Sequence, residues 1–288
     1  MSGRFPSVAR VAVAVLAISA ITHAQAPSFS ARVEAVRVDV LVTENGQPVR
    51  GLGPADFDVY DNGVLQKVDL VSFEQIPLNI VLALDMSASV NGERLDNLRS
   101  AGDSLVTSLK REDHVGLVTF SHLVTLGSGL TDDFPAVRTA VRRVAGYGGT
   151  ALVDGALAAM ALGESDAGRS LLIVFSDGVD TASWLPSSAV LDLAKRSDVV
   201  VYAVATTSRV KPEFLRDLTS LTGGKLYEVE KTANLGLIFF KVLEEFRQRY
   251  LVSYTPKGVE EQGWHRLEVR VKTRKATVQA RPGYLSGP

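Results

Sequence analysis

The sequence predicts an α/β protein in which a doubly wound, mostly parallel sheet is inserted into a small antiparallel β module. Continuous apolar runs at 80–84, 171–175 and 199–204 have the character of strands buried on both faces. Segments with apolar residues at every third or fourth position separate these runs, as helices between parallel strands do. Residues 34–73 and 251–280 instead alternate apolar and polar side chains, which is typical of half-buried antiparallel strands.

The composition is that of a soluble globular protein. The chain has 288 residues, of which 46% are apolar and 22% are charged, and its net charge is −1. No basic patch is wide enough to indicate a nucleic-acid partner. The chain has no cysteine, so its stability depends on its core rather than on disulfides.

Residues 1–24 predict a secretory signal peptide. Arg4 and Arg10 precede an apolar core from Val11 to Ile21, and small residues around Ala24 form the expected cleavage site. A membrane-spanning helix needs about 20 apolar residues, and this core is shorter. We therefore expect a secreted, periplasmic or cell-envelope protein with no transmembrane segment in the mature chain. An amphipathic or buried first helix is the alternative.

The N-terminal flank, residues 25–76, is predicted to be an antiparallel meander. Apolar residues alternate with polar ones over 36–42, and further strands are expected at 57–60 and 68–71. Asn45-Gly46 and Asn62-Gly63 are strong hairpin signals, because both central residues of the favoured turn need positive φ.

Pro77 marks the start of the predicted α/β domain, 77–250, in which strands and helices alternate. Apolar stripes predict helices at 95–109, 134–144, 151–162, 188–196, 212–221 and 235–250. Additional strands are expected at 115–120, 123–126 and 225–229, with 123–126 at an edge.

The C-terminal flank, residues 251–288, returns to the β pattern and is predicted to end with a strand at 277–280. Each flank alone is near the size at which a hydrophobic core is marginal. We therefore expect the segment 251–288 to pair with 34–73 in one β module.

Oxygen-bearing side chains follow the predicted parallel strands. Asp85, Ser87 and Ser89 come after the first apolar run, Thr150 lies in a Gly-Gly-Thr loop, and Asp177 follows the second run. Ligands bind at the carboxyl ends of strands in such sheets. Carboxylates and hydroxyls with no His or Cys nearby suit a hard cation such as Mg²⁺. Any one of these residues could equally be a helix cap, but their joint placement favours a metal site.

The run D-x-S-x-S, a distant Thr and a distant Asp resemble the metal-ion-dependent adhesion site of the von Willebrand factor type A domain. All five positions match: Asp85, Ser87, Ser89, Thr150 and Asp177. The flanking motifs D-F-x-V-x-D-N-G at 56–63 and R-P-G-Y at 281–284 look like those of a secreted bacterial subfamily. The resemblance implies that family's Rossmann-like fold.

The resemblance also implies a mechanism. Ser87, Ser89 and, in one state, Thr150 would bind Mg²⁺ directly, with Mn²⁺ or Ca²⁺ as alternatives. Asp85 and Asp177 would act directly or through water. The Asp or Glu carboxylate of a protein partner would then replace a water. The sequence thus predicts a non-enzymatic, divalent-cation-dependent protein-binding or adhesion module.

The sequence admits two other interpretations of function. Enzyme activity finds little support, because no G-x-S-x-G or nucleotide-binding motif is present and no His can be placed near Ser87. The stronger alternative is a secreted structural scaffold whose β module carries the interaction and whose metal is structural or absent.

Three further features have two interpretations each. Asp180 is either a support for the metal ligands or a solvated loop acid. Trp184 and Leu185 form either a partner-contacting rim or ordinary packing. The helix 235–250 matches in position the element that shifts in family members with switchable affinity, and simple packing is the alternative.

Overall fold

The computed structural model describes residues 35–73, 76–164, 168–207, 210–272 and 275–287. The predicted signal peptide, 1–24, lies outside these residues. Within the described ranges, no helix has the length and apolar character needed to cross a membrane.

The central sheet has six strands in the order β11-β10-β9-β6-β7-β8. Their bounds are β6 (Leu78–Asp85), β7 (His114–Phe120), β8 (Val124–Thr131), β9 (Arg169–Ser176), β10 (Val200–Thr206) and β11 (Leu226–Val229). All neighbours are parallel except β8, which pairs antiparallel with β7 at the edge. Every residue of β6 and β9 is buried, which explains the apolar runs 80–84 and 171–175 within them. The predicted doubly wound sheet is confirmed.

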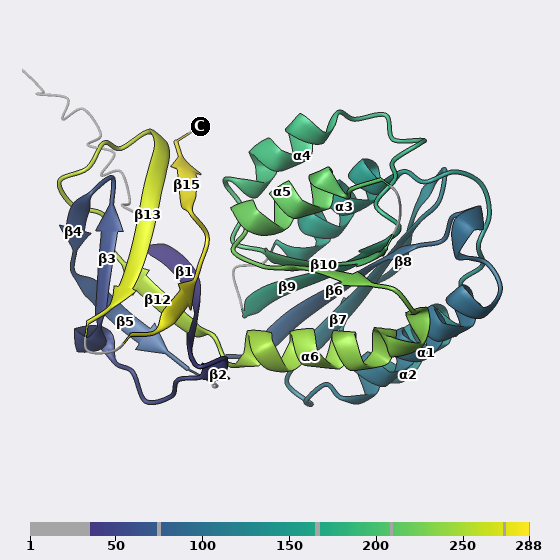
Figure 1. Ribbon diagram of the computed structural model, residues 1–288, viewed down its shortest axis with the longest axis horizontal. Helices are drawn as coiled ribbons and strands as arrows, with labels where there is room; N and C mark the ends of the chain where they lie inside the picture. The colour runs from purple at the N-terminus through teal and green to yellow at the C-terminus, as the bar shows by residue number, and fades with distance from the viewer. Residues whose placement is uncertain (1–34, 74–75, 165–167, 208–209, 273–274, 288) are drawn as a thin grey trace, which may run out of the picture. The chain divides into compact units, whose positions relative to one another are not determined.

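Helices cover both faces of this sheet (Figure 1). One face carries α1 (Glu93–Thr107), α2 (Phe134–Arg143) and α6 (Leu235–Arg247), and the other carries α3 (Leu152–Gly163), α4 (Ser187–Ala194) and α5 (Glu213–Leu221). Alternate residues of β6 enter the two cores: Ile80 packs with the α1 side and Val81 with the α3 side. Short 3₁₀ turns lie at η1 (Pro54–Asp56), η2 (Ala88–Val90) and η3 (Thr232–Asn234).

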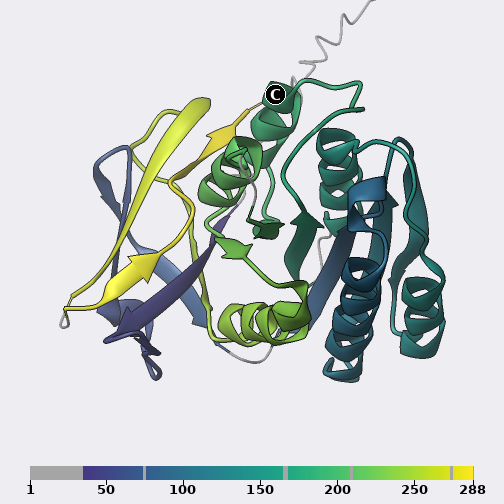
Figure 2. The ribbon, with the colours of Figure 1, turned by 45° about the vertical axis from the view of Figure 1, so that its right-hand side comes forward.

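The two flanks form one antiparallel β module, as predicted. Its strands are β1 (Val36–Glu44), β2 (Gln47–Pro48), β3 (Phe57–Asp61), β4 (Val64–Gln66), β5 (Val68–Ser72), β12 (Tyr250–Tyr254), β13 (Gly263–Val271), β14 (Thr277–Gln279) and β15 (Gly283–Ser286). β1 lies between β12 and β14, and β13 lies between β3 and β15. Figure 2 shows these N-terminal and C-terminal strands side by side.

Several elements differ from the sequence prediction: β4 was not predicted, β8 extends to Thr131 rather than to Leu126, and the last helix and the last strand also differ. The last helix ends at Arg247 rather than at Tyr250, because Tyr250 begins β12 and donates its hydroxyl to Val49 O at 2.8 Å in the core of the β module. An apolar residue continues the helical stripe and also fits a buried strand, so periodicity could not separate the two. The strand β15 was not predicted, since its short Gly-containing sequence acquires strand geometry through pairing with β13.

Arg249 joins the end of α6 to the β module. Its buried guanidinium donates to Tyr202 Oη at 2.8 Å, to Gly223 O at 2.7 Å and to Asp39 O at 3.3 Å. Tyr202 belongs to β10, Gly223 lies in the segment that precedes β11, and Asp39 belongs to β1. A buried cation with several acceptors fixes the connection between α6 and β12.

Candidate metal centre

The candidate site lies where β6 and β9 end side by side. Leu84 of β6 pairs with Phe175 of β9, so Asp85 and Ser176 occupy neighbouring strand ends and Asp177 follows at once. This edge is formed by the carboxyl ends of the parallel strands, the place where ligands bind in open α/β sheets.

Asp85 is a fully buried carboxylate with both oxygens oriented. Oδ1 accepts the backbone N–H of Ser87 at 2.9 Å, and Oδ2 accepts the hydroxyl of Ser176 at 2.7 Å. Burial raises the pKa of Asp85, hydrogen bonds from Ser87 and Ser176 lower it, and the charge of Asp177 raises it again. The site therefore places a buried carboxylate, Asp85, next to a partly exposed one, Asp177.

A chain of hydroxyls leads from this carboxylate to Asp177. Ser89 Oγ donates to Asp177 Oδ2 at 2.8 Å, and the Ser87 and Ser89 hydroxyl oxygens are 3.0 Å apart. Since Ser89 has one hydroxyl proton, Ser87 is the donor of the pair when Ser89 bonds to Asp177. Four of the five predicted residues are thus brought together by direct bonds.

Thr150 is buried and is held in the adjoining loop by its backbone. Its N–H donates to Thr181 Oγ1 at 2.9 Å, and its carbonyl accepts from Thr181 and Ala182 at 2.9 and 3.0 Å. The same loop bonds to the Asp85–Ser89 segment: Tyr147 N–H donates to Met86 O at 2.8 Å and Ala88 N–H donates to Gly148 O at 3.0 Å. The fifth residue is therefore linked to the other four through backbone bonds.

Gly148 is required for this loop geometry. Its φ is +72°, and a Cβ at this position would lie 2.3 Å from His122 Nδ1. A side chain would thus meet both an unfavourable φ and a collision with the imidazole.

Asp180 is exposed, as a solvated loop acid is, and its carboxylate also has partners within the protein. Its Oδ1 accepts Leu152 N–H at 2.8 Å and Ser183 Oγ at 2.5 Å, so it fixes the start of α3 next to Thr150. Ser176, which orients Asp85, and Thr181, which holds Thr150, were missed by sequence reasoning. Ser176 could have been found from its place at the end of a buried strand, directly before Asp177.

The donors at this edge are hydroxyl and carboxylate oxygens, the types that hard divalent cations prefer. Among the described residues, no cluster of three or more His, Cys, Asp or Glu side chains could hold a metal. The residues present at the strand ends fit Mg²⁺ better than they fit a soft ion, because every donor is oxygen.

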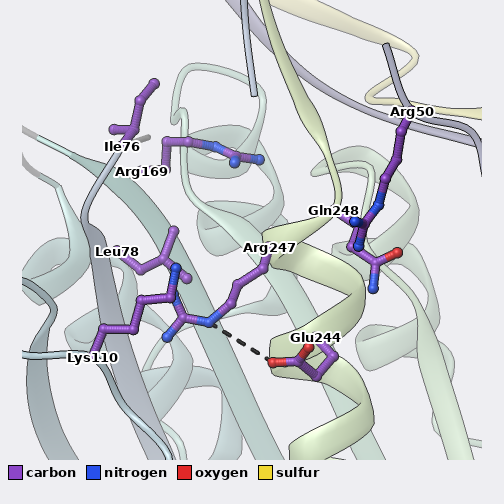
Figure 3. Close-up of a pocket in the computed structure, with 8 residues that line it drawn as sticks. All are labelled: Arg50, Ile76, Leu78, Lys110, Arg169, Glu244, Arg247 and Gln248. Atoms are coloured by element: carbon purple, nitrogen blue, oxygen red, sulfur yellow. Dashed lines mark ion pairs between the residues drawn. The ribbon is translucent and has the colours of Figure 1, made fainter. Parts of the chain in front are cut away.

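A separate cavity lies at the other end of the parallel strands, where β6 and β9 begin (Figure 3). Its volume is about 230 Å³, and its lining is rich in cationic side chains. The residues that line it are Arg50, Ile76, Leu78, Lys110, Arg169, Glu244, Arg247 and Gln248. Leu78 and Arg169 begin the strands whose other ends carry the candidate site. Arg169 pairs with Asp39, and Arg247 pairs with Asp113 and, at 3.9 Å, with Glu244. These ion pairs give the cavity lining a structural role.

Comparison with known protein families finds a match over most of the α/β domain. The family model of the von Willebrand factor type A domain matches residues 79–241, which is more than half of the chain.

Two curated proteins are similar over part of their length. The uncharacterized protein sll0103 from Synechocystis sp. is 30% identical over 83 residues, covering 28% of this chain and 20% of its own. Inter-alpha-trypsin inhibitor heavy chain H2 from Sus scrofa is 26% identical over 182 residues, covering 57% of this chain and 20% of its own. The chain therefore spans about a fifth of these relatives.

Solved structures share the fold at low sequence identity. A von Willebrand factor type A protein from Catenulispora acidiphila superposes with a TM-score of 0.56 at 13% identity, over 85% of this chain and 76% of its own. Proximal thread matrix protein 1 from the mussel byssus, with a zinc-occupied MIDAS motif, gives 0.55 at 16% identity, over 65% and 49%. The von Willebrand factor domain of the pili tip protein Mfa5 from Porphyromonas gingivalis gives 0.50 at 14%, over 59% and 94%.

Proposed function

This chain belongs to the von Willebrand factor type A family, whose domains are protein-interaction modules, and we propose that it binds a protein partner through a divalent cation. The ligands in this proposal are Asp85, Ser87, Ser89, Thr150 and Asp177. The observation that carries it is the continuous set of bonds from Ser176 through Asp85, Ser87 and Ser89 to Asp177. Residues far apart in sequence form one oxygen-lined site at the edge where ligands bind.

Each residue has a distinct task in this proposal. The Ser87, Ser89 and Thr150 hydroxyls are neutral donors, while Asp85 and Asp177 balance the ionic charge directly or through water. Bound Mg²⁺ supplies a coordination position that an Asp or Glu carboxylate of the partner can occupy. Because few of the donors are charged, the site retains its attraction for that carboxylate.

The ligand set is already ordered before binding. Ser176 and the Ser87 backbone hold Asp85 in one orientation, and Thr181 with Ala182 holds the Thr150 loop. Groups that are fixed in advance lose little conformational entropy when they bind. Mg²⁺ is the first choice for oxygen donors, and Mn²⁺ and Ca²⁺ are the alternatives. Zinc enters the test because a mussel protein of this fold has a zinc-occupied MIDAS motif.

We place this function outside the cytoplasm, on the strength of the signal peptide predicted at residues 1–24. Expressing the full chain and identifying the N-terminus of the mature protein in envelope fractions tests this placement. Processing after Ala24 is the expected result, and an unprocessed cytoplasmic chain would contradict it.

Isothermal titration with Mg²⁺, Mn²⁺, Ca²⁺ and Zn²⁺ tests the cation site directly. We expect binding by the wild type, loss of binding in Ser89→Ala, and no change in the matched control Ser188→Ala on the exposed surface of α4. If no ion binds at millimolar concentration, the cation site is refuted and the scaffold alternative gains support.

A further inference from the structure

Large apolar side chains are exposed on the loops around Thr150. Leu123 is 58% exposed, Tyr147 52%, Trp184 92% and Leu185 37%. We call these four residues the apolar rim. Single exposed apolar residues are common on protein surfaces, but a group of them on converging loops is a mark of an interaction site.

Backbone bonds show that the three rim loops converge on Thr150 and Ala151. Ala151 N–H donates to Ser121 O at 2.6 Å, and Ser121 N–H donates to Leu123 O at 3.0 Å. Tyr147 precedes Thr150 in the same loop, and the Thr150 carbonyl accepts the N–H of Ala182, which is close in sequence to Trp184. The three loops that carry the rim are therefore joined to one another by backbone bonds at Thr150 and Ala151.

The backbone beneath Trp184 is fixed although its indole is exposed. The Asp154 carboxylate of α3 accepts Trp184 N–H at 2.9 Å and Leu185 N–H at 3.1 Å. Ser183 Oγ in turn accepts Val153 N–H at 3.0 Å. An exposed indole gains no burial energy in the free protein, but a rigid support lowers the entropy lost when a partner covers it.

Tyr147 is supported by a ring contact. Its ring meets His122 edge to face, with centroids 5.1 Å apart and an interplanar angle of 76°. Tyrosine and tryptophan are enriched among the residues that dominate binding energy at protein interfaces.

The polar side chains beside Trp184 are occupied within the protein. Ser183 bonds to the start of α3 and to Asp180, Thr181 Oγ1 bonds to Thr150 N–H, and Asp154 holds the 184–185 backbone. A glycan would need free polar side chains for its hydroxyls. An apolar side chain gains from covering the rim without such bonds, so the rim favours a protein partner.

We propose that the partner is a protein segment in which an Asp or Glu lies within a few residues of exposed aromatic or aliphatic side chains. The acid reaches the cation site, and the apolar side chains cover Trp184, Tyr147 and their neighbours in the rim. This inference rests on the proposed function, and it adds the apolar character of the partner sequence to it.

Three pools of short peptides, titrated against the purified protein in Mg²⁺, test the inference. The first pool has a central Asp flanked by Leu, Ile and Phe, the second has the same Asp flanked by Ser, Thr and Asn, and the third replaces the Asp of the first by Asn. We expect the first pool to bind about tenfold more tightly than either of the others. The chain has two tryptophans, so a Trp264→Phe background isolates Trp184, whose emission should shift to the blue when the first pool binds.

Variants then locate the contact. Trp184→Ala and Tyr147→Ala should each weaken the first pool about tenfold while metal binding by titration stays unchanged. Leu237→Ala is the matched control, because Leu237 is 73% exposed on α6 and lies outside the rim. Trp184→Phe provides a second, milder variant, and thermal melts verify that each protein is folded.

The outcomes separate the two proposals. If the first and second pools bind equally and both require Asp and Mg²⁺, the cation function stands and the apolar rim is overturned. Unchanged binding in Trp184→Ala also overturns the rim, as does a protein that binds metal but none of the pools. If no metal binds, the proposed function fails and the rim inference fails with it.

Discussion

Asp85 and Asp61 are both fully buried, yet their surroundings differ in kind. Asp61, at the end of β3, accepts Tyr254 Oη at 2.8 Å and Tyr284 Oη at 2.9 Å on one oxygen, and His265 Nδ1 lies 2.8 Å from the other. Asp85 receives one backbone N–H and one hydroxyl, and its charged neighbour is another carboxylate, Asp177. The Asp61 network is closed by donors from three strands, whereas Asp85 lies beside a second carboxylate.

The Asp61 network closes the β module. Tyr254 comes from β12, His265 from β13 and Tyr284 from β15. Burial is the largest cause that raises the pKa of both tyrosines, and the neighbouring Asp61 raises it further. Both hydroxyls therefore keep their protons and act as donors. His265 Nε2 lies 3.0 Å from Ser286 Oγ, which also bonds to Glu261 O at 2.8 Å. The imidazole stacks on Tyr284 with centroids 4.6 Å apart. Asp, His and Ser here hold the last strand to the module.

Of the substitutions that test the difference between Asp61 and Asp85, Asp61→Asn is expected to change stability most. The amide NH₂ would face donors that now point at a carboxylate, and the charge opposite His265 would be lost. We expect the free energy of unfolding to fall by about 3 kcal/mol, measured by urea denaturation. A decrease of less than about 1 kcal/mol in the free energy of unfolding would show that this network contributes little to the stability of the β module.

Asp85→Asn is the matched substitution in the open site. It removes a desolvated charge next to Asp177 and keeps an oxygen for Ser176, while the amide NH₂ would face the Ser87 N–H, so a gain and a cost oppose each other. In EDTA we expect unfolding free energy to change by no more than about 1 kcal/mol, in either direction. The increase in Tm that Mg²⁺ should give the wild type is expected to disappear. A destabilisation as large as that of Asp61→Asn would remove the distinction between the two carboxylates.

Thr150→Ala sharpens the comparison within the open site. Thr150 is held by its backbone, so loss of its hydroxyl should shift Tm by only a few degrees, about 1 kcal/mol or less. Binding to the acidic apolar peptide pool in Mg²⁺ should fall about tenfold. Thermal melts beside peptide titration measure both quantities, and equal losses in the two would assign Thr150 to folding alone.

The smallest change in stability is expected at Asp103, a partly exposed carboxylate that serves as a reference for the buried Asp61 and Asp85. Hydrogen bonds from Arg138, with Arg142 beside it, lower the pKa of Asp103 from 3.8 to about 2. A lowered pKa in the folded state means that this contribution is complete above pH 3.8 and is lost as the pH falls towards 2. Because the three side chains are partly exposed, we expect Asp103→Asn to cost about 1 kcal/mol or less at neutral pH.

The control for this prediction is the pH dependence itself. Denaturation at neutral pH and near pH 2 should show a difference between wild type and Asp103→Asn only at neutral pH. An equal difference at both values would assign the effect to lost packing rather than to charge.

Much of the α/β domain could be predicted because its signals are local. The apolar runs of β6 and β9 identify buried strands within a few residues, and the Asp85–Ser89 run needs no distant partner to be noticed. The positions of Thr150 and Asp177 followed from the resemblance and from the rule that parallel strands end at one edge. The helix-to-strand change at Tyr250 was misplaced, because its apolar character fits both structures.

What the sequence alone determined is therefore most of the strands and helices, the pairing of the flanks and the residue types at the strand ends. Tertiary structure decided which side chains meet: Ser176 with Asp85 across 91 positions, Asp154 with the Trp184 backbone across 30, and Tyr284 with Asp61 across 223. These partners carry no periodicity, and hydrogen bonds between distant residues form only after the chain is packed. The same polar residues can therefore close a core at Asp61 and leave a charged site open at Asp85.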